Sequence, residues 1–142
     1  MSNDTAIDLP GILVNGWKSN LRFLIPRSTG GTGFIVSVEK SHPLYPPLAA
    51  SVESSTDGVG ALSIFFKDLA SNWRGWVGEK VWKDLDETVR VSAKCDRGGH
   101  VCLTVVLTIW PDDQLRATLM YEAGSLESMS RLVSDLFDNH AT

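Results

Sequence analysis

The chain has little cysteine, little histidine and no long apolar run, and each shortage excludes a class of protein. Its 142 residues include two cysteines and three histidines, and two thiols without a nearby histidine cluster cannot supply the four ligands of a structural zinc site. The longest apolar runs, such as residues 101–110, fall short of the roughly 20 residues that a transmembrane helix needs. We therefore expect no metal, no other cofactor and no membrane span.

Basic side chains are also scarce. The sequence holds 13 lysines and arginines against 17 aspartates and glutamates, a formal net charge of −4. A domain that binds nucleic acid usually carries a basic excess, so the balance predicts that nucleic acid is not the partner. Residues 1–8 are polar and acidic, unlike the basic and apolar start of a secretory signal. We expect a cytoplasmic protein whose two cysteines stay reduced.

The length and the 43% apolar content indicate one globular domain. Residues 1–10 lack a periodic apolar pattern and are predicted to be a disordered tail, which leaves residues 11–142 as a single α+β domain. Residues 26–33 are rich in glycine and predict a hairpin loop; they lack the lysine of a phosphate-binding loop. Residues 41–47 carry three prolines and predict an extended connector.

The apolar periodicity predicts two similar halves. Strands are expected over residues 12–25, 34–39, 48–54, 88–96, 100–110 and 114–122. Helices are expected after Asp57 and after Gly124, with Asp57 and Ser125 as caps and a tryptophan-rich loop over residues 73–82. The order βββα-βββα predicts an antiparallel sheet with both helices on one face. Residues expected in the core include Phe65, Leu69, Trp73, Leu103, Val105, Leu107, Leu119, Leu132, Val133 and Leu136.

Apolar residues at odd positions set the register of the second half, because a slip of one residue would turn them to the wrong face. A three-residue loop at residues 97–99 pairs Ala93 with Leu103 and turns Cys95 inward and Cys102 outward. The same parity pairs Ile109 with Leu115 in the next hairpin.

The face opposite the core then collects polar side chains. It presents Arg90, Thr108, Trp110 and Arg116, and guanidinium groups form forked hydrogen bonds with carboxylates and phosphates. A solvated sheet face is the simpler interpretation. His100 lies on the same face opposite Asp96, where the pair either stabilises the turn, which we favour, or acts as an oriented base.

Three of the five tryptophans crowd into residues 73–82. They can form a recognition platform or a lid over the core, and we favour the lid. Trp76 lies between two glycines and away from the helical stripe, so it is the one expected to reach a ligand.

The segment Trp73-Arg74-Gly75-Trp76, the later Trp82, the turn from Asp96 to Val101 and the closing helix after Gly124 resemble a family of small uncharacterised bacterial proteins. The resemblance covers most of the chain from about Leu21 onward. It implies a bacterial, single-domain protein and transfers no catalytic residue.

Three hypotheses follow. The first is a non-catalytic binding protein that presents the outer face of the C-terminal sheet to another macromolecule, with Arg90, Arg116 and Trp110 as anchors. Immunity proteins that neutralise toxins are similar in size and class, and the partner would be a protein. The second is a small-molecule binder or weak enzyme with a pocket beneath the loop from Trp76 to Trp82. The third is homodimerisation through an exposed edge strand.

Overall fold

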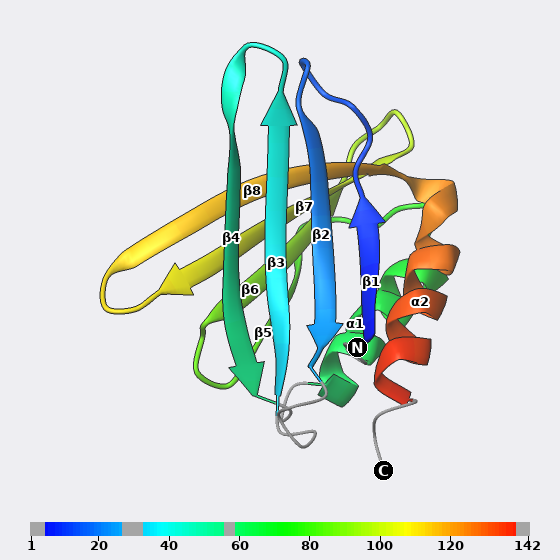
Figure 1. Ribbon diagram of the computed structural model, residues 1–142. Coiled ribbons are helices and arrows are strands. Elements are labelled where there is room, and N and C mark those ends of the chain that lie inside the picture. The colour runs from blue at the N-terminus through cyan, green and yellow to red at the C-terminus, as the bar shows by residue number, and fades with distance from the viewer. Residues whose placement is uncertain (1–4, 27–32, 56–58, 139–142) are drawn as a thin grey trace.

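The computed structural model describes residues 5–26, 33–55 and 59–138 (Figure 1). Within these residues the chain forms two successive runs of four strands and one helix. The first run is β1 (Thr5–Pro10), β2 (Lys18–Ile25), β3 (Gly33–His42), β4 (Tyr45–Ser55) and α1 (Val59–Ser71). The second is β5 (Lys80–Lys83), β6 (Val89–Cys95), β7 (His100–Ile109), β8 (Asp113–Glu122) and, after a short 3-10 turn (Ala123–Ser125), α2 (Leu126–Asp138).

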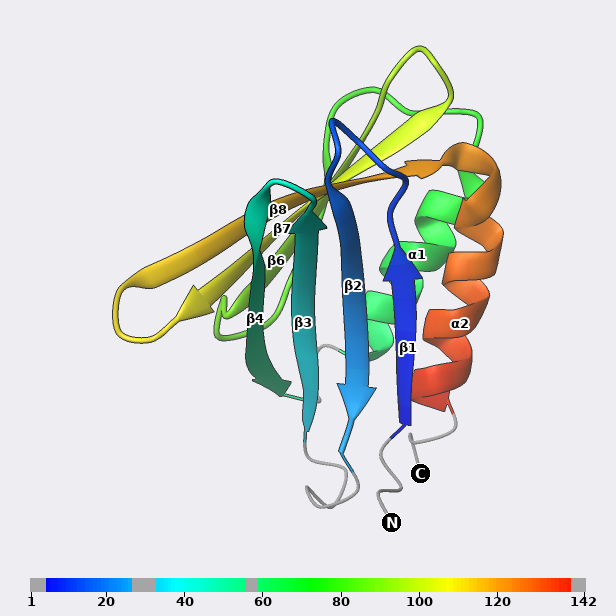
Figure 2. The ribbon, with the colours of Figure 1, turned by 45° about the horizontal axis from the view of Figure 1, so that its top comes forward.

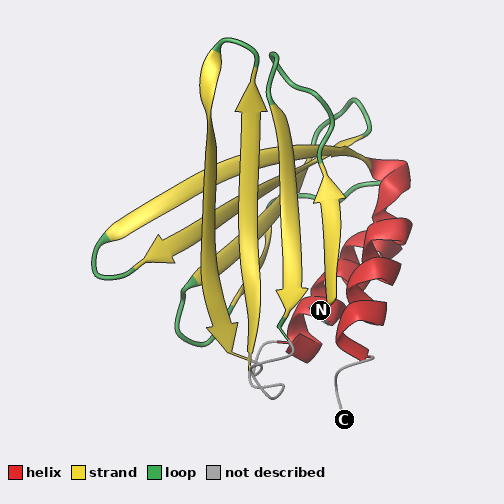
Figure 3. Cartoon of the chain, viewed as in Figure 1, coloured by secondary structure: helices red, strands yellow, loops and turns green. Residues whose placement is uncertain are grey.

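Each run of strands makes its own antiparallel sheet, with strand order β1-β2-β3-β4 in one and β5-β6-β7-β8 in the other. The sheets cross, and β8 passes behind the upper ends of β2, β3 and β4 (Figures 1 and 2). Both helices lie side by side at one flank of the crossed sheets (Figure 3). The α+β class and the antiparallel pairing predicted from the sequence are confirmed, but each unit has four strands rather than three.

The sequence predicts neither β1 nor β5. Residues 5–10 form a strand paired with β2 instead of a disordered tail, and β5 pairs with β6 inside the predicted loop. Each missed strand buries one side chain, Leu9 in β1 and Trp82 in β5. A single buried side chain leaves no alternation in the sequence, so only tertiary pairing identifies these strands.

The proline-rich segment is a hairpin rather than an extended connector. His42 ends β3 and pairs with Tyr45, which begins β4. Pro46 and Pro47 lie inside β4, which is an edge strand. A proline is tolerated at an edge because its missing N–H can face away from the sheet.

The core lies between the sheets and the helices. Phe23, Phe34, Phe66 and Phe137 are fully buried there, and the rings of Phe34 and Phe137 meet edge to face at 5.0 Å. Most of the predicted core residues are buried. The exceptions are Leu132, 42% exposed, and Trp73, 52% exposed; Trp73 follows the end of α1 at Ser71, so the helical stripe no longer directs it inward.

The register of the second sheet agrees with the prediction in one hairpin and differs in the other. Ala93 pairs with Leu103 as predicted. In β7–β8, Ile109 pairs with Asp113 and Leu107 with Leu115, two positions away from the expected pairing. A shift of two keeps every side chain on its face, so alternation alone cannot detect it.

Of the two predicted helix caps, the one at Ser125 is not observed. The hydroxyl of Ser125 donates to the carbonyl of Glu122 at 2.7 Å rather than accepting from the first turn of α2. Asp57 lies outside the described residues, as does most of the glycine-rich loop of residues 26–33.

Polar contacts join the two halves at buried positions. The Asp84 carboxylate, 3% exposed, accepts hydrogen bonds from the Ser54 hydroxyl at 2.8 Å and the Val89 amide at 3.1 Å. The Tyr121 hydroxyl donates to the carbonyl of Leu9 at 2.6 Å. The segment before β2 lies beside β8, where the Ile12 amide donates a hydrogen bond to the Met120 carbonyl.

Candidate functional site

The outer face of the β5–β8 sheet is the side that the core does not cover. Alternate residues point to it from each strand, as the register and burial define. Its members are Val81, Lys83, Arg90, Ser92, Lys94, His100, Cys102, Thr104, Val106, Thr108, Gln114, Arg116, Thr118, Met120 and Glu122. The charged side chains among them are four cations and one carboxylate, in a chain whose net charge is −4.

Three of those cations form one row across the four strands. Lys83 pairs with Arg90, Arg90 pairs with Val106, and Val106 pairs with Arg116. Neighbouring strands are about 4.8 Å apart, so the row spans about 14 Å. We call Lys83, Arg90 and Arg116 the basic row.

The cations differ in how they are neutralised. Lys83 forms an ion pair with Glu87 at 2.7 Å, and Arg90 lies 3.7 Å from Glu79. Arg116 forms no ion pair with any residue in the described part of the chain. Its guanidinium is therefore the member of the basic row most available to an anion.

The outer face of the first sheet has a different charge. There Arg22 is bound to the Asp8 carboxylate at 2.7 Å, and its guanidinium, through this hydrogen bond, lowers the pKa of Asp8. Glu39 and Glu53 lie on the same face, opposite Ala49 and Ile35. The excess of cations is thus confined to one of the two outer faces.

Two concavities adjoin the basic row. One, of about 390 Å³, is lined by two cations, two carboxylates and three uncharged residues: Lys83, Arg90, Asp86, Glu87, Val106, Thr108 and Gln114. The other, also about 390 Å³, lies between β8 and the turn before β2. Its lining includes Arg116 and Thr118 from β8, Trp17 from the turn and Lys40 from β3. We call this second concavity the tryptophan groove.

The structure brings together only part of the site expected from the sequence. Arg90 and Arg116 flank Val106, and Thr108 lies in the next row with Gln114, whose amide donates to its hydroxyl at 3.4 Å. Trp110 is 87% exposed at the tip of the β7–β8 hairpin.

His100 and Trp76 lie elsewhere. His100 begins β7, eight residues from Thr108, a separation of about 27 Å at 3.4 Å per residue. Trp76 is half-buried against the core, and its indole donates to the Ala93 carbonyl at 3.2 Å.

Asp96 and His100 are organised as a turn. One Asp96 oxygen accepts from the backbone amides of Gly98 and His100 at 2.8 and 2.9 Å, and the other lies 3.2 Å from His100 Nδ1. The His100 amide is the main cause of the lowered pKa of Asp96. Burial raises the pKa of the neighbouring Cys102 thiol, which disfavours a thiolate nucleophile. This arrangement favours turn stabilisation over catalysis.

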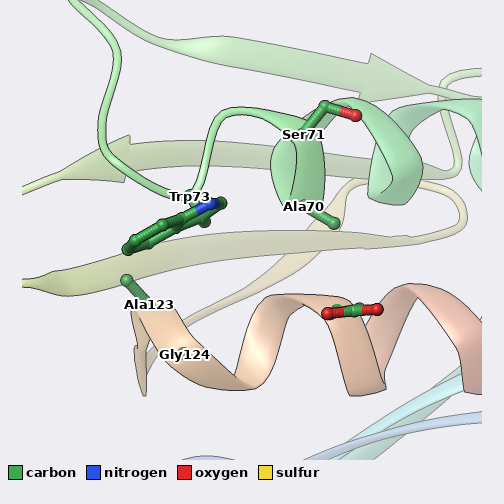
Figure 4. Close-up of a pocket in the computed structure, with 6 residues that line it drawn as sticks. Ala70, Ser71, Trp73, Ala123 and Gly124 are labelled. Carbon is green, nitrogen blue, oxygen red and sulfur yellow. The ribbon is translucent and has the colours of Figure 1, made fainter.

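The tryptophan loop is mostly structural. Trp82 is buried in β5, and Trp76 is held by the hydrogen bond to Ala93. A cavity of about 570 Å³ lies beside Trp73, between the end of α1 at Ala70 and Ser71 and the 3-10 turn before α2 at Ala123 and Gly124 (Figure 4).

Sequence reasoning missed the aromatic cluster around Trp17. The Trp17 ring stacks on Tyr45, with centroids 5.9 Å apart and planes at 7°, and His42 lies 5.0 Å from Trp17. The Lys40 ammonium is 5.4 Å from the Trp17 centroid. The Asn15-Gly16 pair in the sequence indicates a turn just before Trp17. The β2–β3 register that brings Trp17 near residues 40–45 could not be predicted, because a long loop joins these strands and loop length fixes the register only in short hairpins.

In the described ranges, no three or more histidine, cysteine, aspartate and glutamate side chains gather as a metal ion would require. Nor does any helix in those ranges have the length and apolarity to cross a membrane.

Comparison with known proteins identifies a family and a shared fold. The model of a family of unknown function, DUF6228, matches residues 16–140. Curated proteins give no match. The crystal structures of Trypanosoma bruciei MRP1/MRP2 align with a TM-score of 0.54 at 9% identity, over 99% of this chain and 87% of that one. A guide-RNA-binding protein complex bound to a guide RNA aligns with a TM-score of 0.51 at 9% identity, over 99% and 93%. At this identity the likeness concerns the fold alone.

Proposed function

The chain belongs to DUF6228, a family of unknown function, and we propose that it is a non-catalytic binding domain whose outer β5–β8 face holds single-stranded nucleic acid. The family resemblance seen in the sequence is thereby confirmed, and a bacterial origin stays a prediction. The basic row is the observation that carries the proposal, because Lys83, Arg90 and Arg116 present cations at one level across an open sheet.

The chemistry of the face suits a phosphate backbone. Phosphate contacts come from arginine and lysine, supplemented by hydroxyl and amide side chains. Thr104, Thr118, Thr108 and Gln114 supply such groups in the rows next to the cations. Proteins that bind single strands without sequence preference combine a positive surface with aromatic side chains, and Trp17 lies at the edge of this face.

The fold adds support from outside the chain. Both aligned structures share its overall fold, and one of them is a guide-RNA-binding protein complex bound to a guide RNA. Transfer of that role to this chain is a proposal by analogy.

Net charge and local charge give opposite indications here. The value of −4 sums over the whole surface and weakens long-range attraction of a polyanion. Contacts at the basic row depend on the charges within a Debye length, about 8 Å at physiological salt; there Glu87 and Glu79 offset Lys83 and Arg90, and Arg116 has no ion-pair partner among the described residues. We therefore expect binding that is modest and strongly salt-dependent.

An acidic protein is the second candidate partner, as an immunity-like role would require. The observation that favours it is the mixed margin of the face, where Glu79 and Glu87 contact the cations and Trp110 projects from the hairpin. Protein interfaces combine charged margins with exposed aromatic anchors.

Fluorescence anisotropy with a labelled oligo(U) strand of about 20 nucleotides tests the proposal. Three phosphate contacts predict that log K falls with log salt at a slope of about −2 between about 50 and 200 mM. The double substitution R90E/R116E should remove two contacts and make the slope shallower by about 1.4.

The matched control is K67E/R131E, which changes the net charge equally on exposed positions of α1 and α2. It should leave the affinity within about twofold, because both residues lie off the face. Absence of oligonucleotide binding, with R90E/R116E-sensitive binding of poly-glutamate, would replace nucleic acid by an acidic protein partner.

A further inference from the structure

We propose that the tryptophan groove is a stacking subsite that receives one nucleobase of the bound strand, with its phosphate held by Lys40 and Arg116. The inference rests on the proposed function and adds to it a residue-level contact. It stands on the geometry of a turn, an aromatic stack and two cations that line one concavity.

A tight turn fixes Trp17 in place. Val14 and Trp17 form a bridge closed by two backbone hydrogen bonds, at 3.1 and 2.9 Å. The residues between them, Asn15 and Gly16, have φ of 51° and 84°, as a type I′ turn requires. Trp17 is therefore presented by a rigid hairpin bend, and little conformational entropy is lost when a ligand contacts it.

The aromatic rings behind Trp17 fix its orientation. Tyr45 stacks on it nearly in parallel, and the His42 ring lies tilted against both, 5.0 Å from Trp17 and 4.7 Å from Tyr45. The Leu44 amide donates to His42 Nδ1 at 3.0 Å, which holds the imidazole. An indole supported in this way offers a flat surface to a planar ligand.

The charges beside the ring select an anionic ligand. Lys40 approaches the Trp17 ring from β3, and Arg116 reaches the groove from β8 without an ion-pair partner in the described part of the chain. A flexible lysine can exchange its contact with the ring for a phosphate oxygen. Because the groove also begins where the basic row ends, at Arg116, a strand lying along the row reaches Trp17 without a break in positive charge.

The size of the groove fits a nucleotide unit better than a protein surface. Its volume of about 390 Å³ falls in the range of small-ligand sites, about 300–1,000 Å³. An aromatic side chain of a protein partner would fill the ring contact but leave both cations unmatched. A nucleotide supplies the ring and the anion together.

The test compares two strands that differ only in their bases. Anisotropy is measured with oligo(dT) and with an abasic strand of the same length and charge, for the wild type and Trp17→Ala. Stacking contributes about 1–3 kcal/mol per base, so Trp17→Ala should weaken oligo(dT) binding between about fivefold and about 150-fold. It should leave abasic-strand binding and the salt slope unchanged, and Trp17→Phe should restore part of the affinity.

Trp73→Ala is the control, since it removes another tryptophan that is not fully buried, at the far cavity beside α1. Tyr45→Ala is the second variant; it removes the support behind Trp17 at an exposed position and should cause a smaller loss for oligo(dT) only. Thermal unfolding of each variant separates lost folding from lost binding.

Each outcome decides between the two proposals. Equal binding of both strands, unaffected by Trp17→Ala but reduced by R90E/R116E, overturns the stacking subsite and retains the nucleic-acid face. No binding of either strand overturns both. A loss in Trp17→Ala that is the same for the abasic strand also overturns the subsite, because it shows a general effect on the surface.

Discussion

Tyr121 is a single side chain that ties the two sheets together. Its hydroxyl lies in a buried position on β8 and donates to the carbonyl of Leu9 in β1 at 2.6 Å. Burial raises the pKa of this phenol above its ordinary value, because the phenolate would lose its hydration. The buried group therefore keeps its proton at pH values where an exposed tyrosine, with a pKa of about 10, loses it.

The raised pKa of Tyr121 predicts that the free energy of unfolding falls at alkaline pH. Below about pH 10 the phenol is protonated in both states and contributes fully. Above that value the unfolded state releases the proton while the folded state keeps it, so the free energy of unfolding falls as pH rises. Tyr121→Phe should lose about 0.5–1.5 kcal/mol at neutral pH and should show a smaller alkaline decline in urea denaturation.

Tyr45→Phe is the control for this measurement, since it removes a phenol that is exposed and should keep the alkaline decline of the wild type. If the free energy of unfolding fell equally for Tyr121→Phe and the wild type above about pH 10, the buried phenol would not be the titrating group.

At the scale of elements, the Asn15-Gly16 turn precedes β2 and presents Trp17. A Cβ at Gly16 would lie 2.5 Å from His42 Nε2, and the residue has φ of 84°. Both the backbone conformation and the close approach of the imidazole thus require glycine.

Gly16→Ala should therefore lower the free energy of unfolding by about 1 kcal/mol or more and displace Trp17 from Tyr45. Circular dichroism melting measures the first effect. Gly124→Ala is the matched control, because its Cβ would meet nothing within 4 Å. Equal melting temperatures for Gly16→Ala and the wild type would show that the hairpin bend can relax.

Elements with several buried positions could be predicted from the sequence, and elements with one could not. β6, β7 and β8 bury alternate residues such as Val91, Leu103 and Leu119, and their faces follow from parity. β1 and β5 each bury one side chain and depend on their neighbours for identification. The pairing of β7 with β8 shows a second limit, because the observed register places Arg116 beside Val106 instead of beside Thr108.

At the scale of the whole molecule, the candidate site combines one predicted face with one unpredicted groove. Arg90 and Arg116 follow from local alternation, which is why they could be placed on one face before the structure was known. Trp17 and Lys40 meet Arg116 only because the two sheets cross, and no local pattern encodes that crossing. The net charge does not predict the basic row either, because it sums the acidic outer face of the first sheet with the basic outer face of the second.

The edges of both sheets bear on oligomeric state. Prolines occupy the start of β4, the segment before β2 hydrogen-bonds to one end of β8, and β5 is four residues long with a lysine at each end. Each feature is one that blocks edge-to-edge pairing. We expect a monomer in native mass spectrometry at micromolar concentration, and a dimer there would support homodimerisation through an edge strand instead.

The contact between Leu9 and Tyr121 also constrains the order in which the molecule can form. These residues are 112 positions apart, so β1 can pair with β2 early but reaches this partner only after β8 has been synthesised. Contacts of such long sequence separation slow folding, since a large loop must close before they form. On the ribosome, β1 consequently emerges long before its contact with β8 can form.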